Sequence, residues 1–233
     1  MNTISKKFGR AFSALLIFTL LLTSVVVATA CGDDGNLRGT QSAYVVFDDV
    51  SQDDWFSRYV TMGLRFGIIH GVSGNGSLRF EPDRSVTRAE FITMLGRLHE
   101  YGNETIGSPD DETFYESYLN WAVENGIIHG NEYGDLMPES FVTREQMAVI
   151  VHRYITIFDL WEHFSILSPT TAVFGDYFLA SPWARNKIDK LHTYIQGFSR
   201  ERFRPRDNAS RAEVTNLLVQ VGSAVYDGVH PLE

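Results

Sequence analysis

The sequence predicts an all-α fold made of three tandem helical hairpin repeats with short extended segments between the helices, and three observations predict it. A box of hydroxyl residue, arginine, any residue and Glu or Gln occurs three times, as "TRAE", "TREQ" and "SRAE". A proline stands six residues before each box arginine. Apolar residues follow each arginine at offsets of three, six, seven and ten, which is the spacing of one face of an α-helix.

Each repeat begins with a first helix that an aromatic segment opens. The tryptophans of these segments are Trp55, Trp121 and Trp183. They pack in the core or stack on sugar rings, and the first role is the commoner one for tryptophan at a repeated position. A glycine closes the apolar patch that follows, at Gly71, Gly130 and Gly197. We expect the first helix to stop at these glycines, because glycine adopts the left-handed backbone at low cost.

An extended piece then leads to the second helix, which starts at the box. The hydroxyl residue fits the N-cap position, and the Glu or Gln three residues later can accept a hydrogen bond from the backbone N–H of the cap. The N-caps are Thr87, Thr143 and Ser210, and their partners are Glu90, Gln146 and Glu213. One such cap stabilises a helix by about 0.5–2 kcal/mol.

The box arginine is not explained by helix formation, since a cation at the first helical position is unfavourable by about 0.3–1 kcal/mol. The three arginines are Arg88, Arg144 and Arg211. Either they pair with acidic neighbours and tie the repeats together, or they join free helix N–H groups in binding an anion, preferably a planar carboxylate. The residues alone leave both interpretations open.

Residues 1–30 predict an export signal, because Lys6, Lys7 and Arg10 precede an apolar run without charge. The next residue, Cys31, is the only cysteine and predicts lipidation after cleavage, as in a bacterial lipoprotein. Cleavage after Ala30 without lipidation and retention of the run as a membrane anchor are the alternatives. In each case residues 31–43 form a polar linker, and the remainder lies outside the cytoplasm in the cell envelope.

The charge and motif content of the sequence restrict the kinds of ligand that the protein can bind. The chain has 20 Lys and Arg against 29 Asp and Glu, a net charge of −9, so we expect no nucleic-acid partner. The aspartates around Asp49 lack the glycine and the final Glu of an EF-hand loop. His70 and His129 occupy equal turn positions and are simpler as turn residues than as metal ligands. We therefore expect no metal, no cofactor and, in the absence of a catalytic motif, no enzymatic activity.

The stretch "FDDVSQDDWF...GIIHG...FEPDRSVTRAEF" resembles a bacterial S-layer homology repeat, and three such units fit residues 44–102, 108–157 and 172–225, called repeats 1, 2 and 3 below. The resemblance implies a monomer with a pseudo-threefold bundle of three central helices, whose inter-repeat grooves bind a pyruvylated cell-wall polysaccharide. It also implies that the box arginines hold the pyruvate carboxylate, that the cap residues shape the helix start, that Gly71, Gly130 and Gly197 let the sugar approach, and that Asp49 lies near a groove.

The three repeats do not match the family pattern equally. Repeat 2 lacks the Phe-x-Asp-Val start, and repeat 1 is three residues longer between its glycine and its box arginine. We therefore expect one or two of the three grooves to bind. A module that binds another envelope protein, and a small wall-active glycoside hydrolase, are the alternative functions.

Overall fold

The computed structural model describes residues 47–74, 77–108, 111–164, 174–192, 194 and 202–227. The predicted export signal, the polar linker, Cys31 and Gly197 lie outside these residues.

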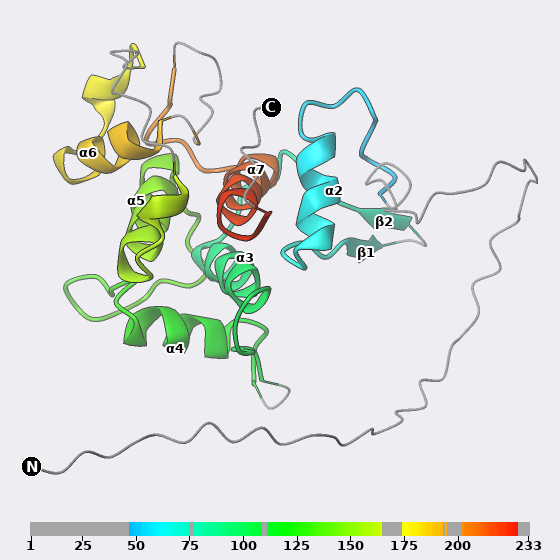
Figure 1. Ribbon diagram of the computed structural model, residues 1–233, viewed down its shortest axis with the longest axis horizontal. Coiled ribbons are helices and arrows are strands. Elements are labelled where there is room, and N and C mark those ends of the chain that lie inside the picture. Colours follow the sequence, from blue (N-terminus) through cyan, green and yellow to red (C-terminus); the bar gives the residue numbers. More distant parts are fainter. Residues whose placement is uncertain are drawn as a thin grey trace, which may run out of the picture. The chain divides into compact units, whose positions relative to one another are not determined.

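Six α-helices are the main regular elements of the described chain, which confirms the predicted all-α class (Figure 1). The first helices of repeats 1, 2 and 3 are α2 (Ser57–Arg65), α4 (Glu116–Glu124) and α6 (Pro182–Leu191). The second helices are α3 (Arg88–Glu100), α5 (Arg144–Ile157) and α7 (Arg211–Gly222). Short 3-10 turns, η1 (Trp161–His163) and η2 (Tyr177–Leu179), and a π-helical turn, η3 (Ser223–Asp227), complete the helical elements.

One antiparallel hairpin lies in the segment by which repeat 1 exceeds the other repeats. It joins β1 (Val72–Gly74) to β2 (Ser77–Arg79), with Val72 opposite Arg79. The extra residues are therefore accommodated in this hairpin, and the box of repeat 1 stays aligned with those of the other repeats.

All three predicted capping boxes are present at the starts of the second helices. In repeat 1, the Thr87 hydroxyl accepts a hydrogen bond from the Glu90 amide at 3.2 Å, and the Glu90 carboxylate accepts one from the Thr87 amide at 2.9 Å. The same pair of bonds joins Thr143 to Gln146 in repeat 2 and Ser210 to Glu213 in repeat 3.

The ends of the first helices differ from the prediction. The helices α2 and α4 end four residues earlier than expected, and the left-handed glycines are Gly67 with φ of 68° and Gly126 with φ of 71°. An extended Ile-Ile-His segment separates them from Gly71 and Gly130. At those two glycines the constraint is close approach: a Cβ atom would lie 2.4 Å from the Leu78 side chain at Gly71, and 2.5 Å from the Gly134 backbone at Gly130.

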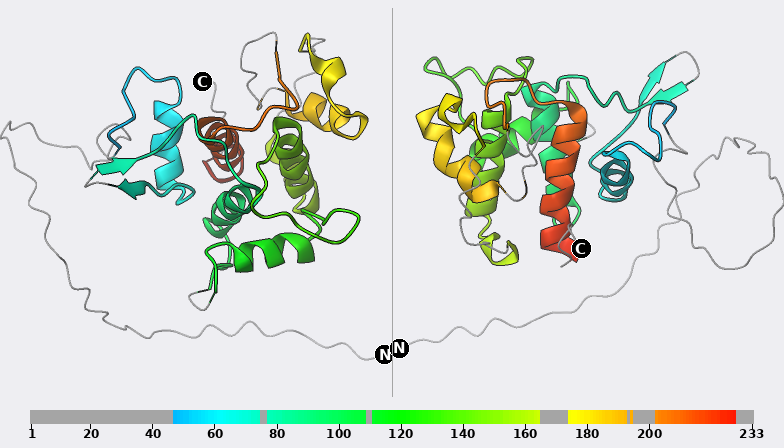
Figure 2. Two further views of the ribbon diagram at one scale, coloured as in Figure 1. Left: turned by 180° about the vertical axis from the view of Figure 1, so that it is seen from behind. Right: turned by 90° about the horizontal axis from the view of Figure 1, so that it is seen from above.

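The helices pair across repeats rather than within them. Helix α4 packs on α3, α6 packs on α5, and α2 packs on α7, so each first helix lies against the second helix of the preceding repeat. The last of these contacts joins the first repeat to the third and closes a ring. Figures 1 and 2 show α3, α5 and α7 together at the centre, with α2, α4 and α6 around them.

A closed triangle of backbone hydrogen bonds lies at the start of the three central helices. The Val86 amide donates to the Ala209 carbonyl at 3.1 Å, the Ala209 amide to the Val142 carbonyl at 2.9 Å, and the Val142 amide to the Val86 carbonyl at 3.0 Å. Each of these fully buried residues stands two positions before its box arginine. The triangle gives the expected pseudo-threefold arrangement a physical basis.

Candidate functional site

The first backbone amides of the second helices are bonded to the next repeat. In repeat 1, the Arg88 amide donates to the Ser140 carbonyl at 2.8 Å and the Ala89 amide to the Pro138 carbonyl at 2.9 Å. Equivalent bonds run from the amides of Arg144, Glu145, Arg211 and Ala212 to the carbonyls of Asp207, Pro205, Arg84 and Pro82.

The third amide of each helix is taken by the N-cap side chain, so no early N–H group is left for a ligand. The hypothesis of free helix N–H groups is therefore wrong for these three helices. The starts of these helices therefore offer an anion side chains and no free backbone amide.

Each box guanidinium also crosses to the next repeat, where it meets a carbonyl oxygen. Arg88 Nη2 donates to the His129 carbonyl at 3.1 Å, and Arg211 Nη2 donates to the His70 carbonyl at 2.5 Å. Arg144 Nε donates to the Phe203 carbonyl at 2.5 Å. The two histidines of the "GIIHG" segments thus orient the arginines with their backbone carbonyls rather than with their rings.

Arg144 is an internal tie. Its side chain is 2% exposed, its Nη1 lies 2.5 Å from a Glu213 carboxylate oxygen, and its guanidinium lies over the Phe203 ring. For this arginine, the structural interpretation holds, because its charge is satisfied by an acid of the neighbouring repeat.

Arg211 lines a cavity of about 400 Å³ between repeats 3 and 1. Its guanidinium lies over the Phe80 ring, and burial followed by the charge of Arg84 lowers the pKa of Arg211. Glu90 also lines this cavity, but its two carboxylate oxygens accept from Arg84 at 3.0 and 2.8 Å. No described carboxylate is within ion-pair distance of Arg211.

Arg88 occupies the equivalent place between repeats 1 and 2 and is partly exposed. Burial followed by the charge of Arg153 lowers the pKa of Arg88. Among the residues that the structure describes, none supplies a carboxylate within ion-pair distance of Arg88. The grooves that begin at Arg88 and Arg211 thus differ from the groove that begins at Arg144.

Two arginines that sequence reasoning missed share these grooves. Arg97 lines the cavity with Arg211, and Arg153 donates to the Ile127 carbonyl at 3.4 Å, beside the His129 carbonyl that Arg88 reaches. Both stand nine residues after a box arginine, so comparing the polar positions within the repeat register, as well as the apolar ones, would have found them.

Asp49 acts on the backbone. Its two carboxylate oxygens accept from the amides of Phe80 at 2.7 Å and Glu81 at 2.8 Å. Glu81 has a left-handed backbone with φ of 59°, a conformation that is unfavourable for a residue other than glycine. In repeat 3, Asp176 makes the same bonds to Phe203 and to Arg204, whose φ is 57°.

The three tryptophans differ in their surroundings. Trp121 packs against His99, Tyr154 and Phe158 as part of the core. Trp55 and Trp183 are about half exposed, and repeat 2 presents the similarly exposed Phe114. Phe114 lines the cavity that contains Arg211 and places an aromatic side chain beside its cationic groups.

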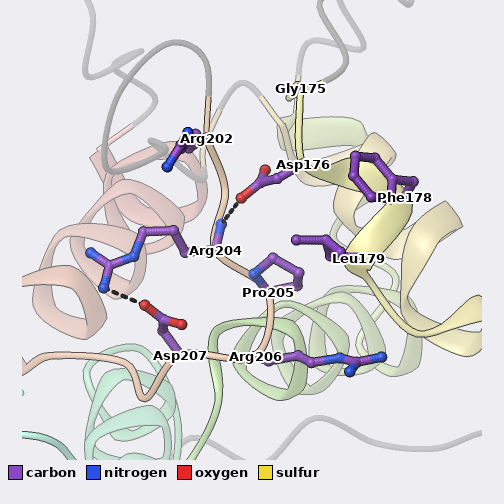
Figure 3. Close-up of a pocket in the computed structure, with 9 residues that line it drawn as sticks. All are labelled: Gly175, Asp176, Phe178, Leu179, Arg202, Arg204, Pro205, Arg206 and Asp207. Atoms are coloured by element: carbon purple, nitrogen blue, oxygen red, sulfur yellow. Dashed lines mark hydrogen bonds and ion pairs between the residues drawn. The ribbon is translucent and has the colours of Figure 1, made fainter.

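A larger cavity of about 730 Å³ lies in repeat 3 and contains Arg202, Arg204 and Arg206 (Figure 3). The three side chains point in different directions, and Arg204 pairs with Asp207. The carboxylate of Asp176 is already engaged by backbone amides. The arginines therefore do not converge on one ligand position.

None of the described helices is long and apolar enough to cross a membrane. No cluster of three or more His, Cys, Asp or Glu side chains in the described ranges could hold a metal ion.

Comparison with known proteins gives the family. The family model described as S-layer homology domain matches residues 46–92 and 108–148. An Endoglucanase from a Bacillus species is 27% identical over 95% of this chain and 23% of its own length. A Surface-layer 125 kDa protein of Lysinibacillus sphaericus is 32% identical over 48% of this chain and 10% of its own length. A Cellulosome-anchoring protein of Acetivibrio thermocellus is 25% identical over 60% of this chain and 32% of its own length. The chain spans a third or less of each of these relatives.

Proposed function

This chain is an S-layer homology domain protein, and on that premise we propose that it is a non-catalytic module that anchors to the cell wall by binding an anionic, pyruvylated polysaccharide. The names of two relatives, a surface-layer protein and a cellulosome-anchoring protein, support attachment at the cell surface. The relative named as an endoglucanase is matched over only 23% of its length, so its name does not argue for catalysis in this chain.

The observation that carries the proposal is the position of Arg211 and Arg88. Both guanidiniums lie where one repeat meets the next, and each is held by a backbone carbonyl rather than by an acid. A carbonyl orients a guanidinium and leaves its positive charge uncompensated. An external carboxylate can supply that compensation.

A pyruvate ketal suits such a groove. It places a planar carboxylate on a sugar ring, and a charge-assisted hydrogen bond to a guanidinium contributes about 1.5–3 kcal/mol. The side chain of Phe114, which is 57% exposed, offers an apolar surface to the sugar at the cavity of Arg211. The net negative charge of the chain does not oppose this, because charges beyond about 8 Å are largely screened at physiological ionic strength.

The N-terminal segment adds a second attachment in this proposal. Lipidation of Cys31, or retention of the apolar run, would hold the chain at the membrane outside the cytoplasm while the repeats bind the wall. Mass spectrometry of the mature N-terminus tests this part, since a diacylated cysteine as first residue has a distinctive mass. A mature chain that starts at an unmodified residue would remove the lipid from the proposal.

Sedimentation with purified cell walls tests the wall-binding proposal. The native protein should pellet with walls that carry a pyruvylated polymer, and should stay in the supernatant after mild acid has hydrolysed the ketals. Binding that survives loss of pyruvate but disappears when the walls are treated with protease would favour an envelope protein as the partner. Release of soluble sugar from the walls by the purified protein would instead reveal a hydrolase.

A further inference from the structure

The position nine residues after the box arginine distinguishes the three grooves. Repeat 1 has Arg97 there, repeat 2 has Arg153, and repeat 3 has Gln220. Because each box arginine reaches into the next repeat, this residue faces the box arginine of the repeat before it. Two grooves therefore contain a pair of arginines from neighbouring repeats, and one does not.

In the groove between repeats 1 and 2, the paired arginines are Arg88 and Arg153. They donate to the carbonyls of His129 and Ile127, which are two residues apart in one extended segment. The two guanidiniums are thus held side by side, and the like charge of Arg153 adds to burial in lowering the pKa of Arg88. The box residue facing them is the neutral Gln146, so the charge of the pair is not offset by the capping box.

In the groove between repeats 3 and 1, Arg211 and Arg97 line the same cavity of about 400 Å³. Burial, followed by the charges of Arg97 and Arg211, lowers the pKa of His70, whose carbonyl accepts a hydrogen bond from Arg211. Glu90 and Arg84 also line the cavity and neutralise each other through their two hydrogen bonds. The remaining charged side chains that line the cavity, Arg97 and Arg211, therefore give it a net charge of +2.

In the groove between repeats 2 and 3, the second arginine is replaced and the first is occupied. The Gln220 amide donates inward to the Tyr194 carbonyl at 2.8 Å and to Asn216 at 2.7 Å. Arg144 is bound by Glu213, and Asp207 stands where repeat 1 has Arg84. Among the described residues of this groove, Arg144 is paired with Glu213 and Asp207 with Arg204, so the charge of each is compensated within the protein.

We propose that the grooves between repeats 1 and 2 and between repeats 3 and 1 each hold one carboxylate of the ligand between two arginines, and that the groove between repeats 2 and 3 is an internal clasp. This assignment rests on the proposed function for the identity of the ligand. Two guanidiniums in apposition repel each other, and a carboxylate between them relieves the repulsion while accepting hydrogen bonds from both. Arg97 and Arg153 are thereby binding residues.

Isothermal titration with a methyl hexopyranoside that carries a pyruvate ketal tests the number of sites. The native protein should bind two molecules per chain, and the methyl ester of the same ketal should not bind. Arg153→Gln and Arg97→Gln should each leave one site of native affinity and weaken the other about tenfold or more, as expected for loss of a charge-assisted hydrogen bond. Arg206→Gln, which removes the same charge from the unrelated cavity of Figure 3, should keep both sites.

Three sites, one site or none in the native protein would overturn the assignment, as would two native sites in the Arg97→Gln, Arg153→Gln double variant. Circular dichroism of each variant separates loss of binding from loss of folding. The wall-sedimentation assay separates this inference from the proposed function. If the double variant sediments with pyruvylated walls like the native protein, the arginine pairs are wrong and anchoring stands. If the native protein itself fails to sediment, the proposed function is wrong.

Discussion

Arg144 and Glu213 form a buried ion pair that joins repeat 2 to repeat 3. The glutamate is also the capping-box residue of α7, where its carboxylate accepts the Ser210 amide at 2.9 Å. One side chain therefore starts a helix and neutralises the arginine that starts the neighbouring helix. The box residue of repeat 2 is Gln146, so the same contact does not occur in the groove of Arg88.

Removing one member of this pair should destabilise the fold. Arg144→Ala is expected to lower the free energy of unfolding by about 3–5 kcal/mol, because it leaves a largely buried carboxylate without its partner. The double variant Arg144→Met, Glu213→Gln should lose clearly less, since no unpaired charge remains. Urea denaturation of the single and double variants measures both, and equal losses would mean that the pair's charge balance is unimportant.

The two functions of the capping box should separate at neighbouring residues. Thr87→Ala removes the acceptor for the Glu90 amide and should lower the free energy of unfolding by about 1 kcal/mol, with wall binding retained. Arg88→Ala removes a partly exposed cation and should weaken wall binding with little change in thermal midpoint. If Arg88→Ala unfolds the protein instead, Arg88 is a structural tie like Arg144.

Asp49 should be a stability residue. Asp49→Ala leaves the amides of Phe80 and Glu81 without their acceptor and should cost about 1–3 kcal/mol of unfolding free energy. Asp53→Ala, an exposed neighbour, should stay within about 0.5 kcal/mol of the native value. A loss of wall binding in folded Asp49→Ala protein would show that the carboxylate has a direct role in the groove.

Acid should destabilise the packing of α6 on α5. Burial, followed by the charges of Lys190 and Lys187, lowers the pKa of His152 from 6.5 to about 4. The His152 ring binds a proton more readily in the unfolded chain than in the folded protein. The stability that comes from keeping this ring neutral is therefore fully present above pH 6.5 and is lost as the pH falls towards about 4. Thermal midpoints between pH 7.5 and 4.5 should fall less steeply for His152→Gln than for the native protein, and parallel curves would exclude His152 as the cause.

The helix starts could be predicted from the sequence because a capping box is local, and each hydroxyl residue and its Glu or Gln lie within one turn. The ends of α2 and α4 were placed at the wrong glycine, because "FGIIHG" and "NGIIHG" each contain two and the extended segment between them is set by tertiary contacts. The pairing of helices across repeats was not predictable either, since three similar repeats do not state which neighbour each helix joins.

The different surroundings of the box arginines follow from residues of the neighbouring repeat. Arg144 is closed by Glu213 of the following repeat, whereas Arg88 faces Gln146 at the equivalent place. Similar motifs thus acquire different environments, because a box arginine lies against the box of the next repeat rather than against its own. Comparing the fourth box residue of each following repeat would have revealed this difference between Arg144 and Arg88.

Because α2 of the first repeat lies against α7 of the third, the number of repeats is fixed by closure and cannot drift. An open solenoid can gain or lose a unit at either end and keep its folded interior. Here a fourth copy would find no free edge, and a missing third copy would uncover both of its neighbours at once. Tighter attachment to a surface would therefore require substitutions in the existing grooves or duplication of the whole ring of three repeats.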